Sequence, residues 1–258
     1  IWLLKLAVTP LLVGAMSLAV RVWGPTLGSL IIGLPWMTGP VLFVLGLDRG
    51  TPWVRDASIG VLLGTVAIAS FALGYAVTAR WRRWHACLLT ATHSFAVAGF
   101  ALADSGVGLA VATLLAAGSL VLARALIPAP PSGSRAGPLP WWDIPARMTA
   151  TAVLVVVIAL SSEVLHPAAS GIVATFPVLT TVIGSFTHAQ WGREAVTALL
   201  RGLLLSLQSF VAFFLVTALT VEPLGLFTSY ALATGAALVV TGMIVLTHRA
   251  RQRALAAK

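Results

Sequence analysis

Apolar runs of about twenty residues recur from one end of this 258-residue chain to the other. An α-helix needs a run of that length to cross the roughly 30 Å hydrocarbon core of a bilayer. Charged residues make up 9% of the chain and hydrophobic residues 59%, with a mean hydropathy of +1.00. A soluble domain of this size needs far more charge on its surface. The sequence therefore predicts an integral membrane protein without a soluble domain.

The apolar runs predict nine membrane spans, and one linker separates them into two groups. The spans fall near residues 3–20, 26–47, 54–79, 84–103, 106–126, 146–163, 168–187, 195–219 and 225–247. The linker, residues 127–145, is rich in Pro, Gly and Ser, which is typical of a loop. We therefore expect a first membrane unit at 1–126, a cytoplasmic linker at 127–145 and a second membrane unit at 146–258.

The distribution of basic residues predicts the direction of the spans. Twelve Lys and Arg residues fall in the loops after the odd-numbered spans and three on the opposite side, while acidic residues show the reverse preference. Because positively charged loops stay in the cytoplasm, the C-terminus is expected inside and the N-terminus outside. The net charge of +9 then belongs to a rim that faces anionic lipid headgroups, and it requires no nucleic-acid partner. The Arg-rich composition favours a bacterial inner membrane.

Two stretches that lie 142 residues apart align without a gap. The segment "GPTLGSLIIGLP" (24–35) falls over "HPAASGIVATFP" (166–177), and the shared register pairs Pro25 with Pro167, Pro35 with Pro177, and Gly50 with Gly192. Five spans separate the two copies, so the second copy enters the membrane from the opposite side. The expected fold class is therefore an all-α membrane protein of about nine helices in two inverted repeats (5+4). This layout resembles that of inverted-repeat secondary carriers.

Pro35 and Pro177 are expected to break spans two and seven near the bilayer midplane, where the two spans cross. An interior proline removes a backbone donor and frees a carbonyl one turn back. In lipid, such groups persist only where they are buried in protein or line a cavity. Kinked helices without a ligand are one interpretation, and a substrate cavity is the favoured one. Its expected binding residues from the two spans are Pro35, Thr38, Gly39, Gly171, Thr175, Pro177, Thr180 and Thr181.

Four further polar residues are expected inside the spans, and each has a structural alternative. His93 is a candidate for binding substrate or protons, or else a buried histidine with an internal hydrogen bond. Arg201 is a candidate for contacting an anion, or else extends towards the membrane surface. Gln208 and Ser209 are candidates for lining the cavity, or else join neighbouring helices.

The expected substrate follows from the charges that the spans lack. No Asp or Glu is expected at mid-depth, and a cationic substrate commonly needs such a carboxylate. Helix N-termini at the breaks supply donors and partial positive charge instead. The predicted function is a secondary transporter that moves a small anionic or neutral solute by alternating access. Two alternatives stay open: a flippase for lipids or lipid-linked precursors, and a non-transporting membrane scaffold subunit.

The sequence contains none of the common catalytic motifs. It has no His-Glu-x-x-His pair, no Gly-x-Ser-x-Gly turn and no phosphate-binding glycine loop. Cys87 is the single cysteine, which excludes an intrachain disulfide and a multi-thiolate metal site. We therefore expect no enzyme activity, no cofactor and no metal. The expected partners are membrane lipids, a small-molecule substrate and, as an open alternative, a second copy of the chain.

Overall fold

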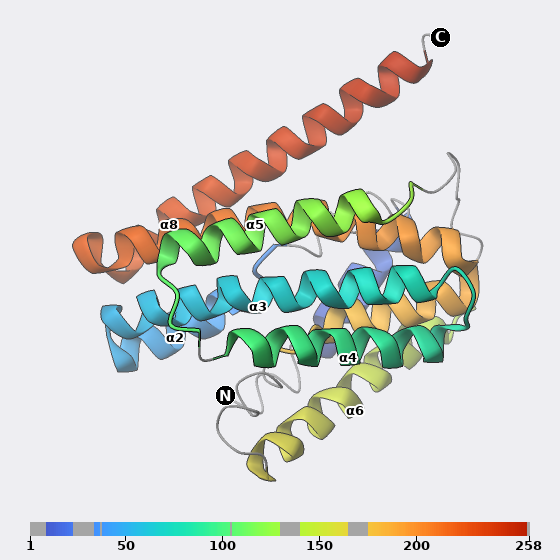
Figure 1. Cartoon of the computed structure of the whole chain (residues 1–258), viewed down its shortest axis with the longest axis horizontal. Coiled ribbons are helices and arrows are strands. Elements are labelled where there is room, and N and C mark those ends of the chain that lie inside the picture. Colours follow the sequence, from blue (N-terminus) through green and yellow to red (C-terminus); the bar gives the residue numbers. More distant parts are fainter. Residues whose placement is uncertain are drawn as a thin grey trace.

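The computed structural model describes residues 9–22, 34–36, 38–103, 105–129, 140–164 and 175–256, and its regular structure there is entirely helical (Figure 1). Seven helices lie in these ranges: Thr9–Val22, α2 (Thr38–Arg49), α3 (Thr51–Thr78), α4 (Trp84–Leu102), α5 (Leu109–Leu126), α6 (Asp143–Val164) and α8 (Val178–Ala256). The long element α8 is interrupted at Gly192 and Gly225, whose φ angles are 79° and 75°. Only glycine adopts such angles readily, so these two residues let the chain change direction within α8.

The expected fold of nine spans in two inverted repeats is wrong. In the described ranges, four helices are long and apolar enough to cross a membrane: α3, α4, α5 and Val178–Thr247 within α8, taken as one. The expected spans 26–47 and 168–187 are not continuous helices where they are described. In their place α2 has 12 residues, about 18 Å, and α8 begins only at Val178. The two stretches align because both are apolar. The alignment therefore does not indicate an inverted repeat in the fold.

The expected spans with clear limits coincide with helices. The ranges 54–79, 84–103 and 106–126 correspond to α3, α4 and α5, and 146–163 corresponds to α6. A polar residue, a glycine or a proline follows or precedes each of these apolar runs. These apolar helices are compatible with a membrane protein.

Pro35 and Pro177 lie before helices, and not within them as expected. The two turns have the same backbone hydrogen bonds: Trp36 N–H donates to Leu34 (2.8 Å) and Gly39 N–H to Pro35 (3.1 Å), while Val178 N–H donates to Phe176 (2.8 Å) and Thr181 N–H to Pro177 (2.9 Å). Proline has no N–H and fits the beginning of a helix, where that donor is not needed. Each proline therefore fixes where the following helix starts.

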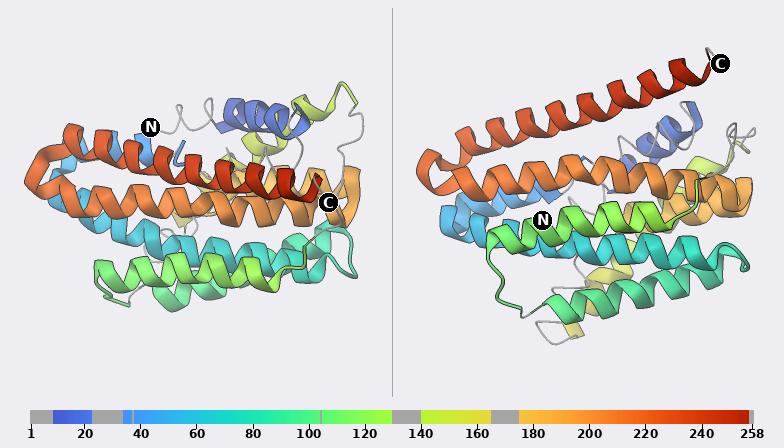
Figure 2. Two further views of the ribbon diagram at one scale, coloured as in Figure 1. Left: turned by 90° about the horizontal axis from the view of Figure 1, so that it is seen from above. Right: turned by 45° about the horizontal axis from the view of Figure 1, so that its top comes forward.

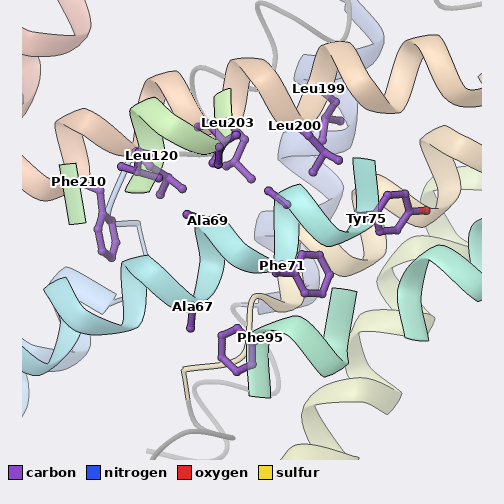
Figure 3. Packing of buried hydrophobic residues seen from close by; sticks show 14 of the residues in the cluster. Ala67, Ala69, Phe71, Tyr75, Phe95, Leu120, Leu199, Leu200, Leu203 and Phe210 are labelled. Carbon is purple, nitrogen blue, oxygen red and sulfur yellow. The ribbon is translucent and has the colours of Figure 1, made fainter. Parts of the chain in front are cut away.

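Helix α3 occupies the centre of the bundle and packs against α4, α5 and α8 (Figures 1 and 2). Its buried Phe71 lies near Phe95 of α4 with Tyr75 on its other side, and Leu120 of α5 and Leu203 of α8 belong to the same core (Figure 3). In a membrane, lipid chains are as apolar as these side chains. Close van der Waals packing therefore has to hold the helices together.

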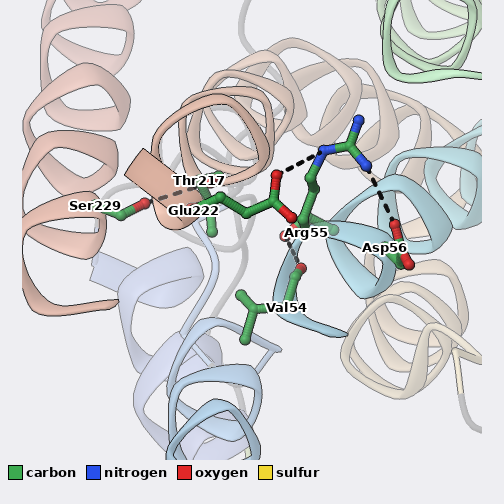
Figure 4. Close-up of polar contacts among 7 residues, drawn as sticks. Val54, Arg55, Asp56, Thr217, Glu222 and Ser229 are labelled. Atoms are coloured by element: carbon green, nitrogen blue, oxygen red, sulfur yellow. Dashed lines mark hydrogen bonds and ion pairs between the residues drawn. The ribbon is translucent and has the colours of Figure 1, made fainter. Parts of the chain in front are cut away.

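The two ends of the bundle differ in charge. The exposed turn between α3 and α4 carries Arg80, Arg82 and Arg83. At the opposite end, Arg55 at the start of α3 contacts Asp56 at 3.5 Å and Glu222 of α8 at 3.7 Å (Figure 4). These pairs are exposed and contribute about 1 kcal/mol or less, so they matter mainly because they neutralise that end.

The close contact between α3 and α4 at Gly74 gives a test of the packing. A Cβ added at Gly74 would lie 2.6 Å from Oγ of Ser94, whereas one added at Gly60 would meet nothing within 4 Å. Gly74→Ala should therefore destabilise the protein by about 1–3 kcal/mol, read from thermal unfolding in detergent. Adding Ser94→Ala should restore most of the loss, and Gly60→Ala is the matched control. Equal stability of the two glycine variants would contradict this packing.

Candidate functional site

A cavity of about 330 Å³ lies between the two proline turns. It is bordered by both turns, the middle of α3 and one face of α6. The second stretch of α8, which lies between Gly192 and Gly225, borders it as well. Its lining consists of Leu34, Pro35, Trp36, Thr38, Val41 and Leu42, then Val61, Gly64, Ile68, Val155 and Ile158, residues 175–180, and Leu203, Leu207 and Phe210. Five of the twelve residues expected to bind substrate are among these: Pro35, Thr38, Thr175, Pro177 and Thr180.

The chemistry of the cavity is mostly apolar. Aliphatic and aromatic side chains form the walls, and no charged side chain of the described residues is part of the lining. The polar members are the hydroxyl groups of Thr38, Thr175 and Thr180 and the indole of Trp36. Pockets for small molecules commonly have this composition and begin at about 300 Å³. The cavity is therefore suited to an uncharged solute with a few hydrogen-bonding groups.

Two helices begin at the cavity. Helix α2 starts at Thr38 and α8 starts at Val178, and both residues are part of the lining. The first N–H groups of a helix have no acceptor inside it and carry partial positive charge. The site therefore offers backbone donors from two directions to a carbonyl or hydroxyl oxygen of a solute.

Gly39, Thr181 and Gly171 are the remaining expected residues from the proline-containing stretches. Gly39 is buried against Phe213, where an added Cβ would lie 3.5 Å from the ring. Thr181 is buried one residue beyond the lining. Gly171 lies outside the described residues. Gly39 therefore serves packing at this position, and Thr181 lies next to the lining residue Thr180 without being part of the lining.

His93, Gln208 and Ser209 lie outside the cavity lining. His93 is on an exposed face of α4. Gln208 Nε2 donates to the carbonyl of Ala117 on α5 at 3.3 Å. Ser209 Oγ accepts from Thr241 Oγ1 at 2.8 Å, which joins the stretches of α8 on either side of Gly225. Gln208 and Ser209 thus make the contacts between helices that were their structural alternative.

Arg201 forms hydrogen bonds with the C-terminal end of α5. Its Nη1 donates to the carbonyl of Arg124 at 2.8 Å and to that of Ile127. The last carbonyls of a helix lack partners within it and carry partial negative charge, so a guanidinium group is a favourable cap. This arrangement leaves Arg201 away from the cavity, where it had been a candidate to contact an anion.

Sequence reasoning missed the walls of the cavity and a buried polar cluster beside it. The sequence did not single out the lining residues Val61, Gly64 and Ile68 of α3, because it does not distinguish apolar residues that line a cavity from those that pack against other helices. The cluster consists of Asp143 and Arg147 of α6 with Gln190 of α8. Arg147 Nε donates to Asp143 at 2.9 Å, Arg147 Nη2 donates to Gln190 at 3.2 Å, and Gln190 Nε2 donates back to Asp143.

The charged pair in this cluster is almost completely enclosed. The side chains of Arg147 and Asp143 are 1% and 0% exposed, and the Arg147 guanidinium also lies 5.1 Å from the centre of the Phe186 ring. Each charge has its partner, so the cluster joins α6 firmly to the first stretch of α8. Losing one partner of such a pair costs about 3–5 kcal/mol. It fixes two walls of the cavity relative to each other.

Comparisons with protein-family models, curated proteins and solved structures found no match to this chain. Nor does any group of three or more His, Cys, Asp or Glu side chains able to hold a metal ion occur in the described ranges. The function therefore has to be argued from the cavity.

Arg201→Met tests the structural assignment of that residue. It keeps most of the side-chain volume but removes the donors, which leaves the carbonyls of Arg124 and Ile127 unpaired. We expect a loss of about 1–3 kcal/mol in the free energy of unfolding. The matched control is Arg193→Met, since Arg193 is exposed on the same element. Unchanged stability of Arg201→Met would show that the cap is not important.

Proposed function

We propose that this protein is a membrane transporter that carries a small uncharged solute through the cavity between Pro35 and Pro177. The observation that carries the proposal is that both proline turns, and the helices that start from them, border one cavity. Irregular backbone in a membrane protein is tolerated where it lines such a space, and solute carriers place their sites there.

The lining favours an uncharged solute over the anionic one that the sequence also allowed. Arg201 is engaged by α5, and the lining residues carry no charge. Selection then depends on shape and on a few hydrogen bonds to Thr38, Thr180 and the two helix N-termini. Alternating access requires that the solute reach these groups from each side in turn.

The apolar walls also support one of the alternatives. Val155, Ile158, Leu203, Leu207 and Phe210 present a continuous aliphatic and aromatic surface, which suits a lipid chain as well as a small solute. A flippase differs from a solute carrier in moving fluorescent lipid between the leaflets of a vesicle. That assay separates the two activities on the same purified protein.

Cysteine accessibility tests the proposed site. In a Cys87→Ser background, Thr38→Cys and Thr180→Cys should react with a small water-soluble methanethiosulfonate, because both positions line the cavity. The matched control is Thr65→Cys. Thr65 is fully buried on α3 between the lining residues Val61 and Ile68, and its hydroxyl donates to the Val61 carbonyl at 3.0 Å.

We expect labelling at 38 and 180 at least about tenfold faster than at 65, since a buried thiol excluded from water does not form a reactive thiolate. Fast reaction at all three positions would point to a loosened structure. If the cysteines at 38 and 180 stay inert in a folded protein, the cavity is dry, the scaffold interpretation holds and the transporter proposal fails.

Charge also supports an orientation in the cytoplasmic membrane of a bacterium. The basic turn between α3 and α4 lies at the same end of the bundle as the end of α5 (Figure 1). By the positive-inside preference this end faces the cytoplasm. Tags within 127–145 and at the C-terminus should then be protected in intact cells, and a tag within 48–56 should be accessible. Opposite locations for the first two tags would refute the orientation.

A further inference from the structure

A line of polar side chains leads away from the cavity along the first stretch of α8. Thr181 follows the lining residue Thr180, Ser185 lies four residues further and His188 three beyond that. This spacing places the three side chains on one face of the helix. On α3, the lining residues Val61, Gly64 and Ile68 are followed two turns later by Tyr75.

The two helix faces meet where Tyr75 contacts His188. The phenolic oxygen of Tyr75 is 3.3 Å from Nδ1 of His188, and the two rings pack edge to face with their centres 5.8 Å apart. Figure 3 shows the hydroxyl end of Tyr75 reaching away from α3. Tyr75 is 1% exposed and His188 is half-buried, so the Tyr75 side of this hydrogen bond is enclosed. It connects residues that are 113 positions apart in the sequence.

Between this pair and the cavity lie two buried hydroxyl groups, those of Thr181 and Ser185. Thr181 is 6% exposed and Ser185 is 7% exposed, and the Thr181 hydroxyl makes no hydrogen bond to any residue that the structure describes. The Ser185 hydroxyl nevertheless lies beside that of Tyr75. Buried hydroxyls are rarely left unsatisfied, so such groups bind ordered water or pair in another state of the protein.

We propose that His188 is the proton-binding residue of the transport cycle, connected to the cavity through Tyr75, Ser185 and Thr181. The proposal rests on the transporter function argued above and adds that transport is coupled to protons. It assigns to His188 the role for which the sequence had offered His93, which lies on an exposed face of α4.

The hydrogen bonds change direction when His188 takes up a proton. With a neutral ring whose Nδ1 has no hydrogen, the Tyr75 hydroxyl donates to that nitrogen. Hydronium from the solvent transfers a proton that converts the imidazole to imidazolium and leaves water, and the new Nδ1–H donates to the Tyr75 oxygen. The Tyr75 hydrogen then turns to Ser185, whose own hydrogen is free to turn towards Thr181. One proton is bound, and the rearranged hydroxyls carry the change towards the cavity.

The surroundings explain why protonation should alter the conformation. From α3, His188 faces Tyr75, and from α4, Cys87 lies close enough to Tyr75 to interact electrostatically. From α6, Asp143 and Arg147 are paired with each other and with Gln190. No acidic side chain of the described residues forms an ion pair with His188. The added positive charge therefore favours a state in which more water reaches the pair.

The test measures how the labelling rate at the cavity depends on pH. Thr38→Cys in the Cys87→Ser background is labelled in lipid nanodiscs between about pH 5 and about pH 8, a range that includes the ordinary titration of histidine. The rate at each pH is divided by that of the same protein carrying His188→Gln, which cancels the ionisation of the thiol. We expect this ratio to change by about threefold or more across the range. As the matched control, the measurement is repeated with His93→Gln in the parent protein. The ratio should then depend on pH as it does without this substitution.

Two further variants test the relay and cover a failure of His188→Gln to fold. Tyr75→Phe keeps the ring and Ser185→Ala keeps the small size, and each removes one hydroxyl. Each should reduce the pH dependence of labelling while size-exclusion behaviour stays that of the parent. A ratio that is constant with pH, or full pH dependence in Tyr75→Phe, overturns the inference but leaves the transporter proposal intact. If the cysteine at 38 is never labelled at any pH, both proposals fall together.

Discussion

Pro35 and Pro177 cannot donate a backbone hydrogen bond, and the arrangement around the cavity depends on this. Each closes a short turn that has two local backbone hydrogen bonds, so part of the interrupted backbone is paired within the turn. The helices that follow start at Thr38 and Val178 and border the same space. A residue that continued the helix at either position would move these starts and close the cavity.

Polar side chains that join the helices hold the walls of the cavity in position. Arg201 caps α5, Gln208 reaches α5 from α8, and the cluster around Arg147 joins α6 to the first stretch of α8. The buried and half-buried side chains with charge or several donors named here are thereby used between helices. What remains at the cavity is a set of threonine hydroxyls and helix N-termini, which suits recognition of a neutral solute by few hydrogen bonds.

The sequence predicted some of this and missed the rest for physical reasons. The limits of α3, α4 and α5 follow from run length and from the polar, glycine or proline residues between runs. The alignment of Pro35 with Pro177 led to five lining residues, although not to the correct fold. The sequence offered His93 because a helix that is apolar all round does not show which face turns inwards, and the structure places His93 on an exposed face of α4. The contact between Tyr75 and His188 joins distant positions, which no local pattern shows.

The central claim is that the turns at Pro35 and Pro177 border one solute-accessible cavity. An experimental density map of the protein in a lipid nanodisc, at a resolution that shows side chains, tests it most directly. The account predicts that helices begin at Thr38 and Val178, with ordered water or solute density between them and next to the threonine hydroxyls. A helix that runs without interruption through Pro35 or Pro177, or aliphatic side chains that fill the space between the turns, would contradict it.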